Sequence, residues 1–148
     1  MSIHILENEN LRATVSDAGA ELISVYDKSR QAERIWTGDP AVWNRHAPVL
    51  FPFVGKVMNG KYRVGKQEYA MKTQHGFARD MDFACVEENA ASVAHCLMAN
   101  DRARAVYPYE FRLTVRHSLK AAILLKKAGY TNVHSLGGVN KYRGKLIP

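Results

Sequence analysis

Two short segments of this chain hold side chains that could move a proton or bind an anion. Arg45 and Lys56 lie in the first segment, and His75 and Arg79 lie four residues apart in the second. An imidazole can act as a general acid or base, and a guanidinium group makes bidentate, geometry-specific hydrogen bonds. These residue types suit a hydroxyl-rich or anionic ligand. The alternative is that they are solvated surface charges and a structural histidine.

The remaining histidines and the cysteines do not form a metal-binding pattern. Four histidines show no ligand-type spacing, so we assign no metal site to them: His4, His46, His95 and His117. Cys85 and Cys96 lie in alternating apolar stretches and could be neighbours on paired strands. We expect both thiols to be reduced residues of the core rather than a disulfide. We predict no cofactor.

The elements that must position these residues are short strands. Apolar residues alternate with a period of two, and turn residues such as Asn59-Gly60 and Gly65-Lys66 separate the runs. The runs lie at residues 3–5, 11–15, 22–26, 34–37, 61–64, 67–71, 83–85, 93–97 and 111–115. This pattern predicts a mainly β chain whose strands pair in an antiparallel arrangement up to about residue 117.

The pattern changes near residue 117, which we take as a domain boundary. Residues 118–128 have helical apolar spacing, with Ser118 as N-cap and Gly129 after the end. A short strand is predicted at 132–136. We therefore divide the chain into a β body, 1–117, and a helix-strand tail, 118–148.

Charge follows the same division. The net charge is +7, all 14 acidic residues precede residue 111, and residues 118–148 carry six Lys and Arg with no acid. Because the basic tail matches no nucleic-acid-recognition motif and has few aromatic residues between its basic ones, we do not expect nucleic-acid binding. No long apolar run or leader-like N-terminus is present in the sequence, so we expect a cytoplasmic protein without a membrane partner.

Four sequence motifs resemble the LacX-like branch of the aldose 1-epimerase (galactose mutarotase-like) family. Residues 43–56, Trp-Asn-Arg-His-Ala-Pro-Val-Leu-Phe-Pro-Phe-Val-Gly-Lys, look like its substrate-facing segment. Residues 74–80, Gln-His-Gly-Phe-Ala-Arg-Asp, look like its His-Gly-Phe-Ala-Arg signature. Residues 107–111 resemble the strand entry that follows, and residues 11–22 fit its opening hairpin. The order and spacing of all four agree.

This resemblance implies a fold and a site. The fold is a partial antiparallel β-sandwich, a fragment of the galactose mutarotase-like supersandwich, followed by the short helix-strand tail. The site binds a hexose or hexose phosphate through Arg45, Lys56, His75 and Arg79, with His75 as a partial catalytic site. Mutarotation needs a base at the C1 hydroxyl and an acid at the ring oxygen. In the family these are a second histidine and a glutamate from the later part of the sandwich, and they have no counterpart here.

Two tryptophans next to this segment allow two interpretations. Trp36 and Trp43 could stack on a pyranose ring, but we expect them to pack in the core or under a loop.

The tail has a resemblance of its own. Residues 118–139 look like the last helix, strand and turn of a rhodanese-type sulfurtransferase domain. In that family the loop before this helix carries a nucleophilic cysteine, whereas residues 115–117 here are Val-Arg-His. Sulfur transfer is therefore not expected.

Three functional hypotheses remain: a hexose or hexose-phosphate mutarotase, a sugar-binding protein that is catalytically incomplete, and a truncated or chimeric product without evolved activity. A half-sandwich would also leave sheet edges and an apolar face uncovered, which predicts self-association or a tail that folds back as a cover.

Overall fold

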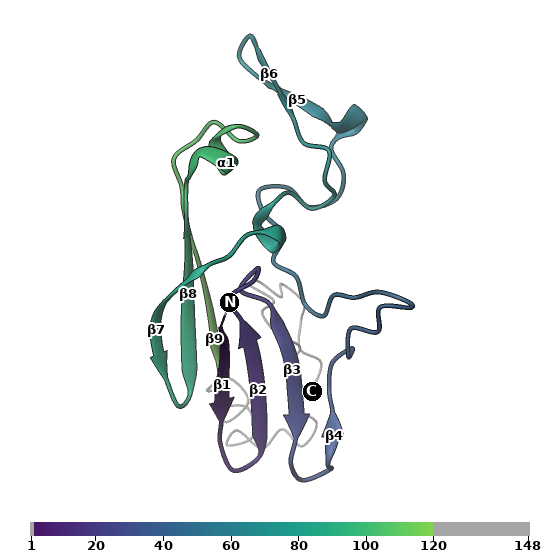
Figure 1. Cartoon of the computed structure of the whole chain (residues 1–148), viewed down its shortest axis with the longest axis vertical. Helices are drawn as coiled ribbons and strands as arrows, with labels where there is room; N and C mark the ends of the chain where they lie inside the picture. Colours follow the sequence, from purple (N-terminus) through teal and green to yellow (C-terminus); the bar gives the residue numbers. More distant parts are fainter. Residues whose placement is uncertain (1, 120–148) are drawn as a thin grey trace, which may run out of the picture.

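The computed structural model describes residues 2–119, and these residues are mainly antiparallel β structure, as predicted (Figure 1). The strands are β1 (Ile3–Glu7), β2 (Leu11–Ser16), β3 (Leu22–Asp27), β4 (Ala32–Glu33), β5 (Lys61–Val64), β6 (Gln67–Ala70), β7 (Ala84–Asn89), β8 (Ser92–Met98) and β9 (Arg112–Ser118). Helical structure in this range is limited to α1 (Asp101–Arg104) and two 3₁₀ segments, Met58–Gly60 and Ala78–Asp80. Ser118, expected as the N-cap of a helix at 118–128, is instead the last residue of β9. The rest of that expected helix, from residue 120, and the strand expected at 132–136 lie outside the described residues.

The N-terminal sheet is a meander with the order β1-β2-β3-β4. Leu6, Ala13 and Val15 point to its buried face, as their period-two spacing requires. The strand expected at 34–37 is instead the two-residue strand β4. Pairing with β3 stops there because the Glu33 carboxylate, rather than the next backbone carbonyl, accepts the backbone N–H of Val25 at 2.6 Å.

Glu33 is held by hydrogen bonds to both sides of this connection. Burial alone would raise the pKa of its carboxyl group, but the Ser24 hydroxyl and the backbone N–H groups of Val25, Arg34 and Ile35 donate to it and lower the pKa below 4.5. The carboxylate form therefore stabilises the fold, and protonation weakens it.

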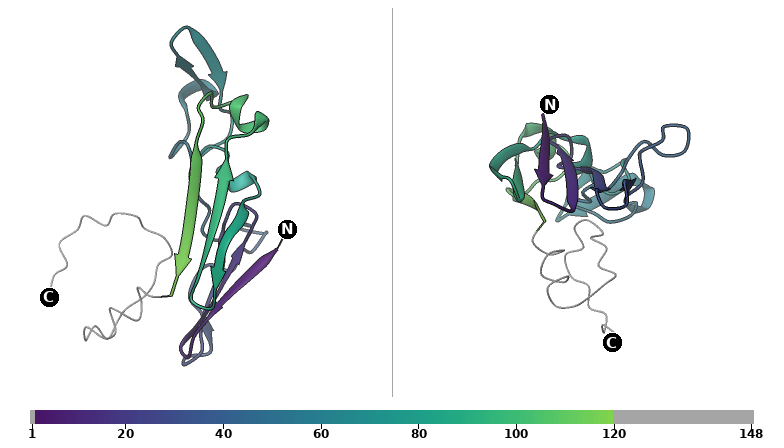
Figure 2. Two further views of the ribbon diagram at one scale, coloured as in Figure 1. Left: turned by 90° about the vertical axis from the view of Figure 1, so that its left-hand side faces the viewer. Right: turned by 90° about the horizontal axis from the view of Figure 1, so that it is seen from below.

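The second sheet has the order β7-β8-β9 and forms a long ribbon that runs past the N-terminal sheet (Figure 2). The turn between β7 and β8 is tighter than the sequence predicts, because β7 extends through residues 87–89. A β-bulge interrupts β7 between Cys85 and Glu87, so that Val86 has no partner on β8. Strand β9 continues to Ser118, and Leu119 is buried in the core.

Two apolar clusters lie between these elements. The first joins the N-terminal sheet to the ribbon, with Leu6 and Val15 packed with Val93 and Leu119. The second surrounds Phe77 and connects the ribbon to the segment that precedes β5. This second cluster supports both sequence motifs.

The two cysteines are free thiols, but only one of them is a core residue. Cys96 is buried, whereas Cys85 is exposed, so the expectation of two core cysteines was wrong for Cys85. They occupy neighbouring register positions on β7 and β8, where Cys85 pairs with His95 and Ala84 pairs with Cys96. Successive side chains of a strand point to opposite faces, which places the two thiols on opposite faces of the ribbon. Within residues 2–119, no helix has the length and apolar character to cross a membrane.

Candidate functional site

The two motif segments, 43–56 and 74–80, lie side by side. Phe51 and Gly76 form an isolated parallel bridge, and the Phe51 carbonyl accepts the backbone N–H of Phe77 at 2.9 Å. Gly76 has a φ of +75°, and a Cβ at that position would lie 2.1 Å from the Phe51 carbonyl oxygen. A side chain there would force the segments apart. The glycine of the His-Gly-Phe motif is therefore required by this close approach.

His75 is fixed by the same contact between segments. Its backbone N–H donates to the Gly55 carbonyl at 2.7 Å, and its Nδ1 accepts the Gly55 N–H at 2.9 Å. An Nδ1 that accepts leaves the proton of a neutral imidazole on Nε2. Nε2 has no protein partner among the described residues. His75 also adopts a φ of +65°, a strained conformation for a residue with a Cβ, and the two bonds to Gly55 hold it there.

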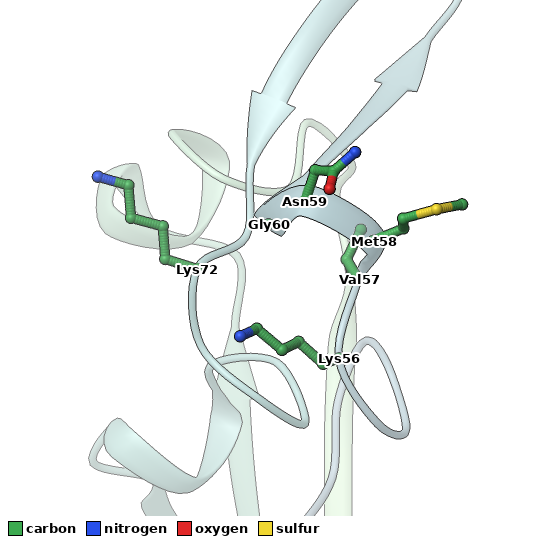
Figure 3. Close-up of a pocket in the computed structure, with 6 residues that line it drawn as sticks. All are labelled: Lys56, Val57, Met58, Asn59, Gly60 and Lys72. Atoms are coloured by element: carbon green, nitrogen blue, oxygen red, sulfur yellow. The ribbon is translucent and has the colours of Figure 1, made fainter.

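Lys56 follows Gly55 directly and lines a surface cavity of about 460 Å³ (Figure 3). The cavity is formed by the chain on either side of the β5-β6 hairpin, and its lining residues are Lys56, Val57, Met58, Asn59, Gly60 and Lys72. Figure 3 shows the Lys56 side chain extending across the opening, while Lys72 points away from it. Neither ammonium group has an ion-pair partner among the described residues. Lys72 lies outside the sequence motifs, so no motif identified it as a residue of this cavity.

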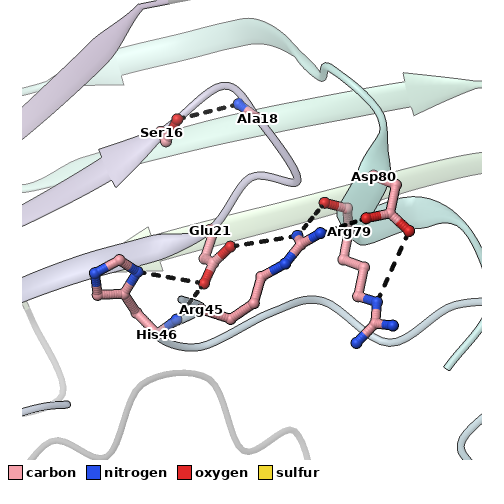
Figure 4. Close-up of polar contacts among 7 residues, drawn as sticks. All are labelled: Ser16, Ala18, Glu21, Arg45, His46, Arg79 and Asp80. Atoms are coloured by element: carbon pink, nitrogen blue, oxygen red, sulfur yellow. Dashed lines mark hydrogen bonds and ion pairs between the residues drawn. The ribbon is translucent and has the colours of Figure 1, made fainter. Parts of the chain in front are cut away.

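Arg45 is engaged by protein groups on three sides (Figure 4). Its Nη1 donates to the Arg79 carbonyl at 2.7 Å and lies 3.8 Å from the Glu21 carboxylate, while Nη2 contacts the Asp80 carboxylate. The guanidinium group therefore ties the first motif segment to the second and to the turn before β3.

Arg79 contributes its backbone to this network more than its side chain. Its Nε is buried and has no hydrogen-bond partner, and the nearest acidic oxygen, on Asp80, lies 3.9 Å away. Gly19 packs against it, since a Cβ at Gly19 would lie 2.8 Å from the Arg79 carbonyl oxygen. The Arg79 side chain is thus about one fifth exposed, with its Nε buried against the protein.

Sequence reasoning did not identify the acidic members of this network. Glu21 is buried, with 6% exposure, and accepts the backbone N–H of His46, whose Nδ1 lies 3.5 Å from the same carboxylate. Both Glu21 and Asp80 belong to the motifs, but the sequence of a motif does not show which basic side chain a carboxylate will contact in the fold.

The four predicted site residues thus form two pairs. Arg45 and Arg79 are in direct contact, and His75 and Lys56 meet through Gly55. No hydrogen bond or ion pair joins one pair to the other within residues 2–119. The His75 Nε2 and the Lys56 ammonium group have no protein partner among these residues, and the Arg79 Nε has no hydrogen bond either.

The two tryptophans lie on the surface close to the first motif. Trp36 is 41% exposed and Trp43 is 46% exposed, and the Trp36 indole N–H donates to the Trp43 carbonyl at 2.7 Å. Neither ring is a core residue, so the expectation of core packing was wrong, and packing under a loop stays a prediction. Exposed indole rings are available to stack on a ligand.

Known proteins are similar to this chain in both sequence and fold. The family model for aldose 1-epimerase matches residues 2–127. Protein LacX (plasmid) of Lactococcus lactis subsp. lactis is 32% identical over 134 residues, which cover 88% of this chain and 44% of LacX. The chain thus spans less than half the length of this relative.

Two solved structures resemble this chain closely. A galactose mutarotase related enzyme from Lactobacillus acidophilus is 37% identical, with a TM-score of 0.77 over 80% of this chain and 39% of that one. A galactose mutarotase-like protein from Lactobacillus casei ATCC 334 is 39% identical, with a TM-score of 0.77 over 80% of this chain and 40% of that one. The sequence and the fold agree, and the chain belongs to the aldose 1-epimerase family.

Proposed function

We propose that this chain binds a hexose or a hexose phosphate beside His75 and Lys56. The observation that carries the proposal is the pinned imidazole of His75, whose Nε2 has no protein partner among the described residues while Nδ1 is held by Gly55. A ring fixed in this way presents one donor in a defined direction, which is what a sugar hydroxyl requires. Family membership makes a sugar the ligand class to test.

A phosphorylated hexose is the ligand that we favour. Lys56 and Lys72 both line one cavity, and neither ammonium group has an ion-pair partner within the described part of the chain. The Lys56 side chain extends across the opening, whereas Lys72 points away from it and adds a second positive charge nearby. An unneutralised cation at the opening favours a dianionic phosphate over a neutral sugar. Arg45 is an unsuitable phosphate ligand because its donors are used by Asp80, Glu21 and a carbonyl.

The same inventory argues for weak or absent mutarotase activity of the 148-residue chain by itself. Ring opening needs one group that removes the C1 hydroxyl proton and another that protonates the ring oxygen. His75 is one candidate, and Arg45 and Arg79 are permanent cations that cannot take the second role. Each missing proton-transfer partner costs about a hundred-fold to ten-thousand-fold in rate.

The binding proposal is tested by calorimetric titration of the purified chain with glucose 6-phosphate and, in parallel, glucose. We expect the phosphate sugar to bind more tightly, and we expect Lys56→Met to weaken its binding at least about fivefold, the loss of roughly one charge-assisted hydrogen bond. Lys66→Met is the matched control, since Lys66 is an exposed lysine in the β5-β6 turn and does not line the cavity. Equal affinity for both sugars, or equal loss in both variants, would contradict the proposal.

The catalytic proposal is tested by polarimetry of freshly dissolved α-glucose and α-galactose. We expect acceleration at most weakly above the buffer rate. Enzyme-like acceleration that disappears in His75→Ala would overturn the proposed incompleteness while leaving the binding site in place. Self-association stays a prediction, and light scattering of the same samples tests it.

A further inference from the structure

A second cluster of polar side chains lies where the N-terminal sheet meets the ribbon, and it uses none of the residues of the sugar site. His4 of β1, Cys85 of β7 and His95 of β8 come together, and one donor atom from each lies within 4.8 Å of the other two. Strand β1 is in contact with β8. Residues 91 positions apart in the sequence are thus brought into one cluster.

The β7 bulge is what aims the strand residues at β1. Cys85 pairs with His95, and Glu88 pairs with Val93, two residues away on β8. Positions two apart on a strand face the same side, so Cys85 and Glu88 face the same side although they are three positions apart. In a regular strand an odd spacing would place them on opposite faces. The unpaired Val86 corrects the register.

His95 is buried in an arrangement that leaves both of its ring nitrogens without a hydrogen bond. His95 has no exposed surface, and neither of its ring nitrogens has a hydrogen-bond partner. Its Nε2 lies 3.3 Å from an Asp17 carboxylate oxygen, without the geometry of a hydrogen bond. A buried imidazole whose ring nitrogens make no hydrogen bond is destabilising unless another group satisfies them.

His4 has the opposite arrangement, with a carboxylate oxygen at each ring nitrogen. Asp17 lies 2.9 Å from Nε2 and Glu88 lies 3.0 Å from Nδ1. The His4 and His95 rings meet edge to face, with centroids 4.9 Å apart. Whichever nitrogen of His4 binds an ion, the other keeps a carboxylate partner, and metal-bound histidines usually donate their other ring N–H to such a group.

We propose that His4, Cys85 and His95 bind a divalent transition-metal ion of the zinc type, with Asp17 and Glu88 as the surrounding carboxylates. Two imidazoles and one thiolate are the donor set that Zn²⁺ and Co²⁺ prefer. Tetrahedral bonds of roughly 2.0–2.3 Å place ligand atoms about 3.3–3.8 Å apart, so the three donors need to close by about 1 Å. Cys85 is exposed and gives the ion a way in. A fourth position is filled by the carboxylate released from His4 or by water.

Cobalt binding to the reduced full chain tests this proposal, because a cobalt–thiolate bond has a charge-transfer absorption in the near ultraviolet. The chain has only two cysteines, so the band can come only from Cys85 or Cys96. We expect one equivalent of Co²⁺ to produce the band and one equivalent of Zn²⁺ to remove it. We expect Cys85→Ala to abolish it and Cys96→Ala, the matched control on the other face of the ribbon, to retain it.

A second variant separates metal binding from a simple loss of fold. His4→Asn should lower Co²⁺ affinity at least about tenfold. Its far-ultraviolet circular dichroism without metal should stay that of the parent chain. No band at stoichiometric cobalt, a band that survives Cys85→Ala, or unchanged affinity in a folded His4→Asn variant would each overturn the proposal.

Discussion

Replacing Arg45 tests whether this residue holds the two motif segments together. In Arg45→Ala the chain loses the hydrogen bond to the Arg79 carbonyl, worth about 1 kcal/mol, and the bonded ion pair with Asp80. A charge-assisted bond is worth about 1.5–3 kcal/mol when buried, but Asp80 is 31% exposed, so we discount it to about 1 kcal/mol. The buried Glu21 also loses its nearest guanidinium group. We expect a loss of about 2 kcal/mol in the free energy of unfolding.

Urea unfolding followed by circular dichroism measures this loss. Arg45→Lys should fall between the parent and the alanine variant, because an ammonium group keeps the charge but cannot reach both acceptors in the same fork geometry. Arg30→Ala is the control, since Arg30 is exposed and its side chain makes no hydrogen bond or ion pair within residues 2–119. A double-mutant cycle with Asp80→Ala should give a coupling of about 1 kcal/mol. An Arg45→Ala variant as stable as the parent, or a coupling near zero, would refute the structural role.

Three further predictions concern the turn geometry and one carboxylate. Gly76→Ala should abolish folding or destabilise the chain by more than about 3 kcal/mol, because its Cβ would meet the Phe51 carbonyl oxygen at 2.1 Å; Gly65→Ala, with φ +59° and open space around it, should cost only about 1 kcal/mol in the same urea titration. His75→Gly should have a higher midpoint of thermal unfolding than His75→Ala, because glycine adopts the φ of +65° without the strain that alanine keeps. Equal midpoints would show that the position is unstrained. Glu33 has a lowered pKa, so its contribution is present above pH 4.5 and is lost as the pH falls; Glu33→Gln should therefore be less stable than the parent at pH 7 and lose less stability on acidification, and parallel pH profiles would contradict this.

The mainly β fold was predictable from local pattern. Most strand positions followed from the period-two alternation, although the strand expected at 34–37 was wrong, and the β5-β6 hairpin followed from the Gly65-Lys66 turn. The apolar pattern predicts that a strand forms better than it predicts which face of the strand is buried. In β1 the apolar residues Ile3 and Ile5 are more than half exposed, while His4 and Leu6 point inward. His4 is buried because Asp17 and Glu88 satisfy its ring, and neither partner is visible from the spacing of residues 1–7.

The candidate site was predictable as a pair of motifs but not as a network. In the structure His75 lies beside the 43–56 segment, and the roles of the two arginines depend on long-range partners. Arg45 became a structural tie because Glu21 arrives from a turn 24 residues earlier in the sequence. Lys72 joined Lys56 only because the β5-β6 hairpin returns the chain to the same cavity. Such contacts between distant residues have no local signal.

The position of the His75 ring proton is the most direct test of the proposed sugar site. Histidine side-chain ¹H–¹⁵N spectra of the labelled chain, assigned by loss of one ring in His75→Gln, report both nitrogens of each imidazole. We expect the neutral His75 ring to carry its proton on Nε2, with Nδ1 accepting from Gly55, and we expect glucose 6-phosphate to shift Nε2 while the His46 ring is unchanged. A proton on Nδ1, or a His75 ring that does not respond at saturating sugar phosphate, would contradict the account.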